Sequence, residues 1–196
     1  NQPDLDMDSI YEAVSATWSD INHDGNPDLI VVNGVDQSYG EENYGAPRVY
    51  LNDGKGKLSK VAEPFPNLHL SASVIDAADF NNDGFPDLFV GARSVSGNYG
   101  KIPASFLLQN NGQGKFTDVS NAIAKGLSDI GFVTNSSWFD IDKDGDSDLI
   151  VSLEWGLNNS PEGLNIGFTH CYFLTFKSEA DRAIYLPHPD HKAFGK

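Results

Sequence analysis

The sequence predicts a mainly β fold of antiparallel, propeller-type blades, followed by a short α+β segment at the C-terminus. An aspartate-rich loop between apolar strands occurs three times at a spacing of about 60 residues. A Gly-rich hairpin follows two of the three copies, and the pattern changes after the third. A fixed period of this length indicates a repeat architecture in which each repeat is one small sheet.

The repeated loop has the form Asp-x-Asp/Asn-x-Asp-Gly-x-x-Asp and occupies residues 20–28, 79–87 and 140–148. The third copy carries aspartate at every second position, and such carboxylates repel one another unless a cation lies among them. Ca²⁺ takes about six to eight oxygen ligands, and Gly at position 6 permits the sharp turn of a cation-binding loop. An EF-hand is excluded because position 12 is valine in all three copies, where an EF-hand needs glutamate.

The alternative is that the loops are solvated turns, in which Asp and Asn form hydrogen bonds with their own backbone. A single copy would leave the two interpretations equal. Three copies in register, each with Gly at position 6 and Asp at position 9, favour metal sites.

Each repeat is expected to run as strand, loop, strand, connection, strand, hairpin and strand. The hairpins lie at residues 52–56 and 110–114, where Asn and Gly supply the positive φ of tight turns. Trp18 and Trp138 occupy equivalent positions and are expected in the core. The predicted units are two repeats, a partial third repeat and a tail: 1–66, 67–125, 126–156 and 157–196.

The composition limits the class of partner. The net charge is −15 and the pI is near 4.4, which argues against nucleic acid or an anionic membrane surface. Hydrophobic residues make up 39% of the chain, enough for a core, but no apolar run is long enough to span a membrane. The single cysteine, Cys171, excludes an intrachain disulfide framework.

The loops and hairpins resemble FG-GAP/VCBS repeats, which build integrin-α-type β-propellers, over about residues 13–156. The fuller pattern is similar to the secreted VCBS proteins of the ASPIC/UnbV and cartilage-acidic-protein group. The resemblance implies one Ca²⁺ in each of three loops, bound by side chains at positions 1, 3, 5 and 9 and by the carbonyl at position 7. The implied ligands are Asp20, Asn22, Asp24, Asn26 and Asp28; Asp79, Asn81, Asp83, Phe85 and Asp87; and Asp140, Asp142, Asp144, Asp146 and Asp148.

The first two loops carry Asn at position 3, which removes one charge from each. The third loop is therefore expected to bind Ca²⁺ most tightly. His23 fills the variable position 4 of the first loop, where a side chain is expected to point to solvent.

The tail differs from the repeats. Residues 167–176 are typical of a strand, and residues 178–186 are typical of a capped helix. Residues 155–194 resemble the stress-responsive dimeric α/β-barrel (Dabb) family. Three stretches carry that resemblance: 160–165, 168–170 and 188–191.

In cyclase members of the Dabb family, histidines at the positions of His170 and His191 have acid/base roles. The resemblance makes these two histidines candidate catalytic residues. The alternative, structural or surface imidazoles, is favoured because the tail contains only part of a barrel.

We therefore expect an extracellular or cell-surface calcium-binding β-repeat module with a structural, adhesion or assembly role. Propellers need about four to eight blades, and the chain carries two complete units and part of a third. The expected partners are other protein chains, further blades of the same protein, or further copies of the chain. The alternative is a Dabb-like cyclase or small-molecule-binding segment carried on a calcium-stabilised scaffold, so the question of enzymatic activity stays open.

Overall fold

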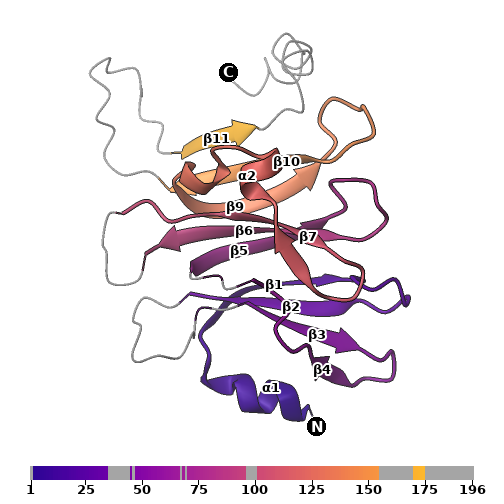
Figure 1. The fold of residues 1–196 in the computed structure, drawn as a ribbon. Coiled ribbons are helices and arrows are strands. Elements are labelled where there is room, and N and C mark those ends of the chain that lie inside the picture. Colours follow the sequence, from indigo (N-terminus) through magenta and orange to yellow (C-terminus); the bar gives the residue numbers. More distant parts are fainter. Residues whose placement is uncertain are drawn as a thin grey trace, which may run out of the picture.

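The computed structural model of the chain describes residues 2–34, 45, 47–66, 68, 70–95, 101–154 and 170–174. These residues form three antiparallel sheets that are stacked in chain order (Figure 1). Within each sheet the strand order follows the sequence, so each strand pairs with its neighbours along the chain. Such local connections are expected for a repeat protein.

The first sheet consists of β1 (Ala13–Ser19), β2 (Asp28–Asn33), β3 (Arg48–Asn52) and β4 (Leu58–Lys60). The second consists of β5 (Ser71–Ala78), β6 (Asp87–Ser94), β7 (Phe106–Asn110) and β8 (Phe116–Asp118). The third contains β9 (Phe132–Phe139), β10 (Asp148–Glu154) and β11 (His170–Leu174). The described helices are α1 (Pro3–Met7), η1 (Asp8–Ile10), α2 (Ser120–Ile123) and η2 (Leu127–Asp129).

The predicted Gly-rich hairpins are present in the first two sheets. Between β3 and β4 the amide of Asp53 donates to the carbonyl of Lys57 at 3.1 Å, and between β7 and β8 Asn111 donates to Lys115 at 2.9 Å. Both hairpins contain glycines with positive φ. The expectation of positive φ is confirmed for the glycines but not for the asparagines. Asn52 and Asn110 act instead through their side chains, which accept hydrogen bonds from the amides of Gly54 and Gly112, each at 3.0 Å.

Strand β11 takes in the third sheet the place that β3 and β7 take in the other two. The two strands β10 and β11 pair antiparallel from Ile150 opposite Leu174 to Glu154 opposite His170. Part of the strand predicted at residues 167–176 thus extends the third sheet. The helix predicted at residues 178–186 lies outside the described residues.

Two apolar layers join the three sheets. Along β6, Leu88 belongs to the layer shared with the first sheet and Phe89 to the layer shared with the third, because alternate residues of a strand lie on opposite faces. The first layer contains Ile21, Ile30, Val32, Val49, Leu68, Ala72, Ile75, Leu88, Val90, Leu108 and Phe116. The second contains Val74, Phe89, Leu107, Leu127, Val133, Leu149, Val151 and Leu153.

The N-terminal helix α1 covers part of the outer face of the first sheet. Leu5 of α1 packs against the buried Tyr50 and Leu58. The equivalents of these residues in the second sheet, Leu108 and Phe116, pack against the first sheet. Helix α1 therefore lies on the side where a preceding sheet would pack in a longer stack.

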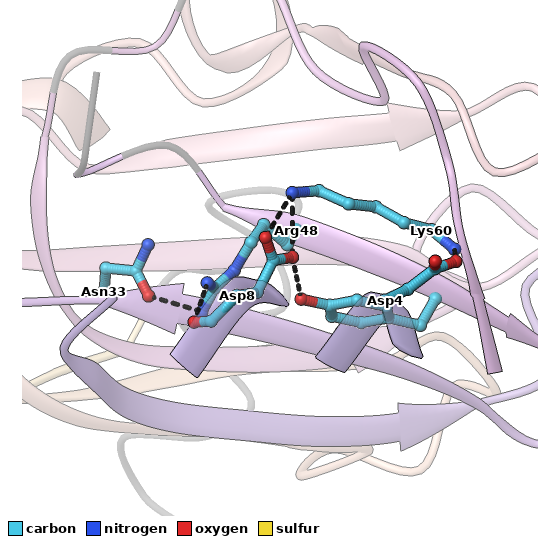
Figure 2. Close-up of polar contacts among 6 residues, drawn as sticks. Asp4, Asp8, Asn33, Arg48 and Lys60 are labelled. Carbon is cyan, nitrogen blue, oxygen red and sulfur yellow. Dashed lines mark hydrogen bonds and ion pairs between the residues drawn. The ribbon is translucent and has the colours of Figure 1, made fainter. Parts of the chain in front are cut away.

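Polar contacts fasten this N-terminal segment to the first sheet (Figure 2). The Asp8 carboxylate lies 2.8 Å from Lys60 Nζ and accepts a hydrogen bond from the Tyr50 hydroxyl. Arg48 donates to the Asp8 carbonyl at 3.2 Å and to the Asn33 side chain at 2.8 Å. Burial raises the pKa of Asp8, but the hydrogen bonds from Lys60 and Tyr50 outweigh burial and hold that pKa below its ordinary value.

The prediction that Trp18 belongs to the core is wrong, since its side chain is 57% exposed. Trp138, its equivalent in the third sheet, packs against the second apolar layer and stacks on Phe80 with ring centroids 6.1 Å apart. Both tryptophans lie on the face that would contact a preceding sheet. Among the described residues Trp138 has such a sheet beside it, whereas the outer face of the first sheet carries a short helix.

The described residues are thus mainly β, and the four-stranded sheets are consistent with propeller blades. The three sheets do not close a ring (Figure 1). No helix within the described ranges is long and apolar enough to cross a membrane.

Candidate metal-binding loops

The three aspartate-rich loops occupy equivalent places in the three sheets. Residues 20–28, 79–87 and 140–148 follow β1, β5 and β9 and lead into β2, β6 and β10. All three lie on one side of the stack, at the right of Figure 1. Positions are numbered 1 to 9 from the first aspartate of each loop.

The three loops share one backbone conformation. Position 4 has a positive φ in each, 58° at His23, 57° at Asn82 and 63° at Lys143. The glycine at position 6 has a positive φ between 86° and 94°. Two left-handed residues so close together fold the chain tightly. The turn at position 6 is as predicted, whereas the left-handed position 4 is signalled only weakly, by the tolerance of Asn and His for this conformation.

Side-chain oxygens at positions 1, 3 and 5 accept hydrogen bonds from backbone amides at positions 5 to 7. In the second loop, Asp79 accepts from the amides of Asp83 and Gly84 at 3.1 and 2.8 Å. Asn81 accepts from Asp83, and Asp83 accepts from Phe85, each at 2.9 Å. The first and third loops repeat these bonds. Such Asx-type bonds account for positions 1, 3 and 5 without a metal.

The aspartate at position 9 is not explained by Asx turns. Asp28 and Asp87 are 0% exposed. Oδ1 of Asp87 accepts from the amide of Asn110 at 2.7 Å, whereas Oδ2 is buried without a hydrogen-bond partner. Neither Asp28 nor Asp87 forms an ion pair with any lysine or arginine in the described part of the chain. A buried carboxylate without a positive partner is energetically costly.

Burial raises the pKa of the position 9 aspartate in each loop, and in Asp87 it raises the pKa to about 7. The amide of Asn110 lowers the pKa of Asp87, while the charges of Asp83 and Asp79 raise it. The amide of Phe80 also lowers this pKa. In the first and third loops the equivalent amides, those of Ile21 and Ile141, donate to Oδ2 of Asp28 and Asp148 at 3.2 and 3.0 Å. Burial and the neighbouring carboxylates thus disfavour the ionised form of Asp87, and a cation beside Oδ2 would favour it.

The third loop brings three carboxylates together. One oxygen each from Asp140, Asp142 and Asp148 lies within 4.8 Å of the other two. Oxygens that share one Ca²⁺ at about 2.3–2.6 Å are at most roughly 5 Å apart. Asp144 lies outside this group and accepts from the amide of Asp146 at 2.9 Å. With carboxylate oxygens as its donors, the arrangement fits a hard divalent cation.

The first two loops hold position 5 differently. The amide nitrogen of Asn22 donates to Asp24 at 3.1 Å, and that of Asn81 donates to Asp83 at 2.9 Å. Backbone hydrogen bonds from position 7 are the main reason that the pKa values of Asp24 and Asp83 lie below the ordinary value. The carbonyl ligands implied at position 7, those of Asn26, Phe85 and Asp146, stay predictions.

Two asparagines that were not predicted as site residues orient position 9. The amide of Asn52 donates to Oδ1 of Asp28 at 2.8 Å, as that of Asn110 does to Asp87. Their side chains donate to the carbonyl of the proline at position 8, at 2.9 and 3.0 Å. The sequence signal was the asparagine that ends the strand before both hairpin turns.

The candidate catalytic histidines have no described side-chain environment. His170 is the first residue of β11 and lies opposite Glu154 of β10, and only its backbone is described. His191 lies outside the described residues. Their acid/base roles stay predictions.

Comparison with protein families gives three matches. The FG-GAP-like repeat matches residues 20–90, and the FG-GAP repeat matches residues 71–114. The Stress responsive A/B Barrel Domain matches residues 143–196. The FG-GAP resemblance drawn from the sequence is confirmed over residues 20–114, short of the third loop. The barrel-domain resemblance is confirmed too, although this match begins at Lys143, inside the third loop, and not near residue 155. The first two loops lie within the FG-GAP matches.

Proposed function

We propose that the three loops bind Ca²⁺ and stabilise a β-repeat module, since the chain contains FG-GAP repeats over residues 20–114. The module has a structural, adhesion or assembly role in an extracellular or cell-surface setting. Extracellular calcium modules bind weakly, at about 10⁻⁴–10⁻³ M, because Ca²⁺ is abundant there.

The observation that carries the proposal is the buried Oδ2 of Asp87. It has no hydrogen-bond partner, no ion-pair partner among the described residues, and the carboxylates of Asp79 and Asp83 for neighbours. A cation at this point would satisfy Oδ2 and offset the repulsion among the three carboxylates. The three converging carboxylates of the third loop support the same interpretation.

The residues of each loop have two roles: some bind the ion and others orient the ligands. Side chains at positions 1, 3, 5 and 9 and the carbonyl at position 7 would hold the ion, which supplies positive charge and a fixed centre. The backbone amides of positions 5 to 7 orient the carboxylates at positions 1 and 5. The hairpin asparagines Asn52 and Asn110 orient position 9. Ion binding would therefore stabilise the folded sheet over the unfolded chain.

Thermal unfolding with Ca²⁺ and with EGTA tests the proposal. A site at an ion concentration of about 100 times its Kd adds roughly 2.7 kcal/mol to the free energy of unfolding, so the melting temperature should rise by several degrees. Equal melting temperatures in Ca²⁺ and in EGTA would contradict the proposal.

Two matched variants locate the effect. Asp87→Asn keeps the shape of the side chain and removes its charge, so it should lose part of the calcium-dependent rise while leaving the EGTA sample as stable or more stable. Asp129→Asn makes the same charge change at an exposed residue outside the loops. It should respond to Ca²⁺ as the parent chain does, and equal behaviour of the two variants would contradict a site at Asp87.

The exposed outer face of the first sheet, at the end of the stack, supports the assembly role. Trp18 is 57% exposed on the outer face of the first sheet, on the side where a preceding sheet would pack. We expect further sheets or further copies of the chain to pack at the ends of the stack. Light scattering in Ca²⁺ tests this role, and a monodisperse monomer at all concentrations would contradict self-assembly.

The barrel-domain match at residues 143–196 favours a second candidate function, a Dabb-like cyclase or a small-molecule-binding segment. Its candidate residues are His170 and His191. If the segment is an enzyme, its turnover rate should fall in both the His170→Ala and the His191→Ala variant. Unchanged turnover rates in these variants would contradict an enzymatic role for the two histidines.

A further inference from the structure

Neighbouring loops contact each other through the same two positions. The position 4 side chain of one loop meets the position 7 side chain of the next. His23 stacks against Phe85 with ring centroids 4.8 Å apart and planes inclined by 38°. Nδ2 of Asn82 donates a hydrogen bond to Oδ1 of Asp146 at 2.5 Å. The chemistry of the two contacts differs, but their places in the loops are the same.

Position 4 is suited to such a bridge because of its backbone. The positive φ values of His23 and Asn82, 58° and 57°, are uncommon for residues other than glycine. Both side chains lie on exposed loops and still reach the neighbouring loop. The repeated left-handed conformation thus places a side chain between two loops in both cases.

Position 7 is where a contact would affect ion binding. Its carbonyl is an implied ligand, and its amide donates to the position 5 carboxylate at 2.9 Å in both Phe85 and Asp146. A contact that fixes the position 7 side chain therefore also restrains the backbone that carries the position 7 carbonyl and contacts the position 5 carboxylate, both of which are implied ligands. The Phe85 ring also packs closely against Gly112 of its own sheet, where an added Cβ would lie 2.8 Å from the ring.

A second bridge joins the first loop to the second sheet. Nδ2 of Asn110 donates to the carbonyl of Ile21 at 2.8 Å and to that of Pro86 at 3.0 Å. Ile21 is position 2 of the first loop and Pro86 is position 8 of the second. The same residue orients Asp87 through its backbone amide. One asparagine therefore connects the backbone of two neighbouring loops.

We propose that the loops bind their ions cooperatively and in series, with His23 and Asn82 as positioning residues that transmit the state of one loop to the next. This inference rests on the proposed calcium function. An ion that orders positions 5 to 7 of one loop would also order the side chain that this loop shares with its neighbour. The neighbour then loses less conformational freedom when it binds, which is positive coupling. Such coupling is reciprocal and is typically at least about 5-fold in affinity.

Each loop contains its own reporter for a site-resolved test. The position 6 amides of Gly25, Gly84 and Gly145 donate to the position 1 carboxylates at 2.9, 2.8 and 3.1 Å. Glycine-selective ¹⁵N labelling allows a Ca²⁺ titration to be followed at each loop through these amide resonances. The midpoint at Gly145 reports the third loop.

The coupling is measured by silencing the second loop with the double variant Asp79→Asn/Asp83→Asn. The midpoint at Gly145 should then weaken by at least about 5-fold. In the Asn82→Gly background, silencing the second loop should shift the Gly145 midpoint much less. The cycle separates the side-chain contact from long-range electrostatics, because the double variant removes the same two charges in both backgrounds.

Lys143→Gly is the matched control. Lys143 has the same loop position and a φ of 63°, and no further aspartate-rich loop follows it in the described part of the chain. It should leave the response of Gly145 to silencing intact. An equal loss of coupling in Lys143→Gly and Asn82→Gly would assign the effect to backbone strain and overturn the inference.

The two levels of proposal fail in different ways. If no glycine amide responds to Ca²⁺, the calcium function itself is wrong. If the amides respond but the Ca²⁺ midpoint at Gly145 is unchanged by the double variant of the second loop, the calcium function stands and the serial coupling is wrong. His23→Gly supplies an independent test, since it should uncouple Gly25 from the second loop and leave Gly145 unchanged.

Discussion

The backbone amide of Asn110 donates a hydrogen bond to Oδ1 of Asp87 across 2.7 Å, which joins the end of β7 to the start of β6. The Asn110 side chain extends the connection to the carbonyls of Pro86 and Ile21 and accepts from the amide of Gly112 at 3.0 Å. With 4% of its surface exposed, Asn110 makes these bonds out of contact with water. The metal loop and the hairpin are therefore one polar unit.

Asn110→Ala should lower the free energy of unfolding by about 2–4 kcal/mol, because a buried and two part-buried side-chain hydrogen bonds are lost and their partners are left unsatisfied. Asn52→Ala removes the equivalent side chain from the first sheet. It should cost only about 1 kcal/mol, because its bonds are exposed to water. Urea unfolding of both variants measures the difference. Equal losses would contradict the role of Asn110 as a link between sheets.

Trp138→Ala should cost about 2–4 kcal/mol, because the ring packs on Phe80 and the second apolar layer. Trp18→Ala, at the equivalent position of the first sheet, should cost less than about 1 kcal/mol because that ring is largely exposed. Chemical denaturation under identical conditions compares the pair. A larger loss at Trp18 would show that its face is covered in solution.

Gly112→Ala and Gly114→Ala separate backbone strain from a steric clash. Both glycines have similar positive φ values, 76° and 73°. A Cβ on Gly112 would lie 2.8 Å from the Phe85 ring, whereas the nearest atom to a Cβ on Gly114 is 3.5 Å away. Gly112→Ala should therefore be less stable than Gly114→Ala by about 1–3 kcal/mol.

A double variant identifies the source of that difference. Phe85→Ala removes the ring that a Cβ on Gly112 would meet. Adding it to Gly112→Ala should recover the steric part of the loss, measured as the interaction energy of a double-mutant cycle. Additive losses would place the strain elsewhere.

Asp8→Asn tests the N-terminal network through its pH dependence. The pKa of Asp8 lies below 3.8 in the folded protein, so the ionised form stabilises the fold above that pH, and the contribution is lost as pH falls through the folded pKa. The variant should be less stable than the parent chain by about 1–3 kcal/mol at neutral pH, and the gap should narrow as the pH falls below 3.8. Asp6→Asn, at an exposed position on the adjoining helix α1, is the control. A gap that is constant with pH would contradict the assignment.

The local features of the loops follow from the sequence because they depend on neighbouring residues. Gly145 at position 6 and the alternating carboxylates around it specify a tight, oxygen-rich turn. All three loops adopt this same turn conformation. The asparagine that orients position 9 is harder to predict. It is separated from its aspartate by 23 or 24 residues, and the two meet only after β2 pairs with β3 and β6 with β7.

The repeat, the three loops and the hairpins can be recognised in the sequence, because each depends on residue types at fixed short spacings. The surroundings of equivalent residues cannot, because they depend on how the sheets stack. Trp18 and Trp138 share a position, yet one is exposed and the other packs on Phe80, because only one has a preceding sheet. The bridges from His23 to Phe85 and from Asn82 to Asp146 also arise only when separate sheets stack in order, since no local pattern specifies a contact between loops about 60 residues apart.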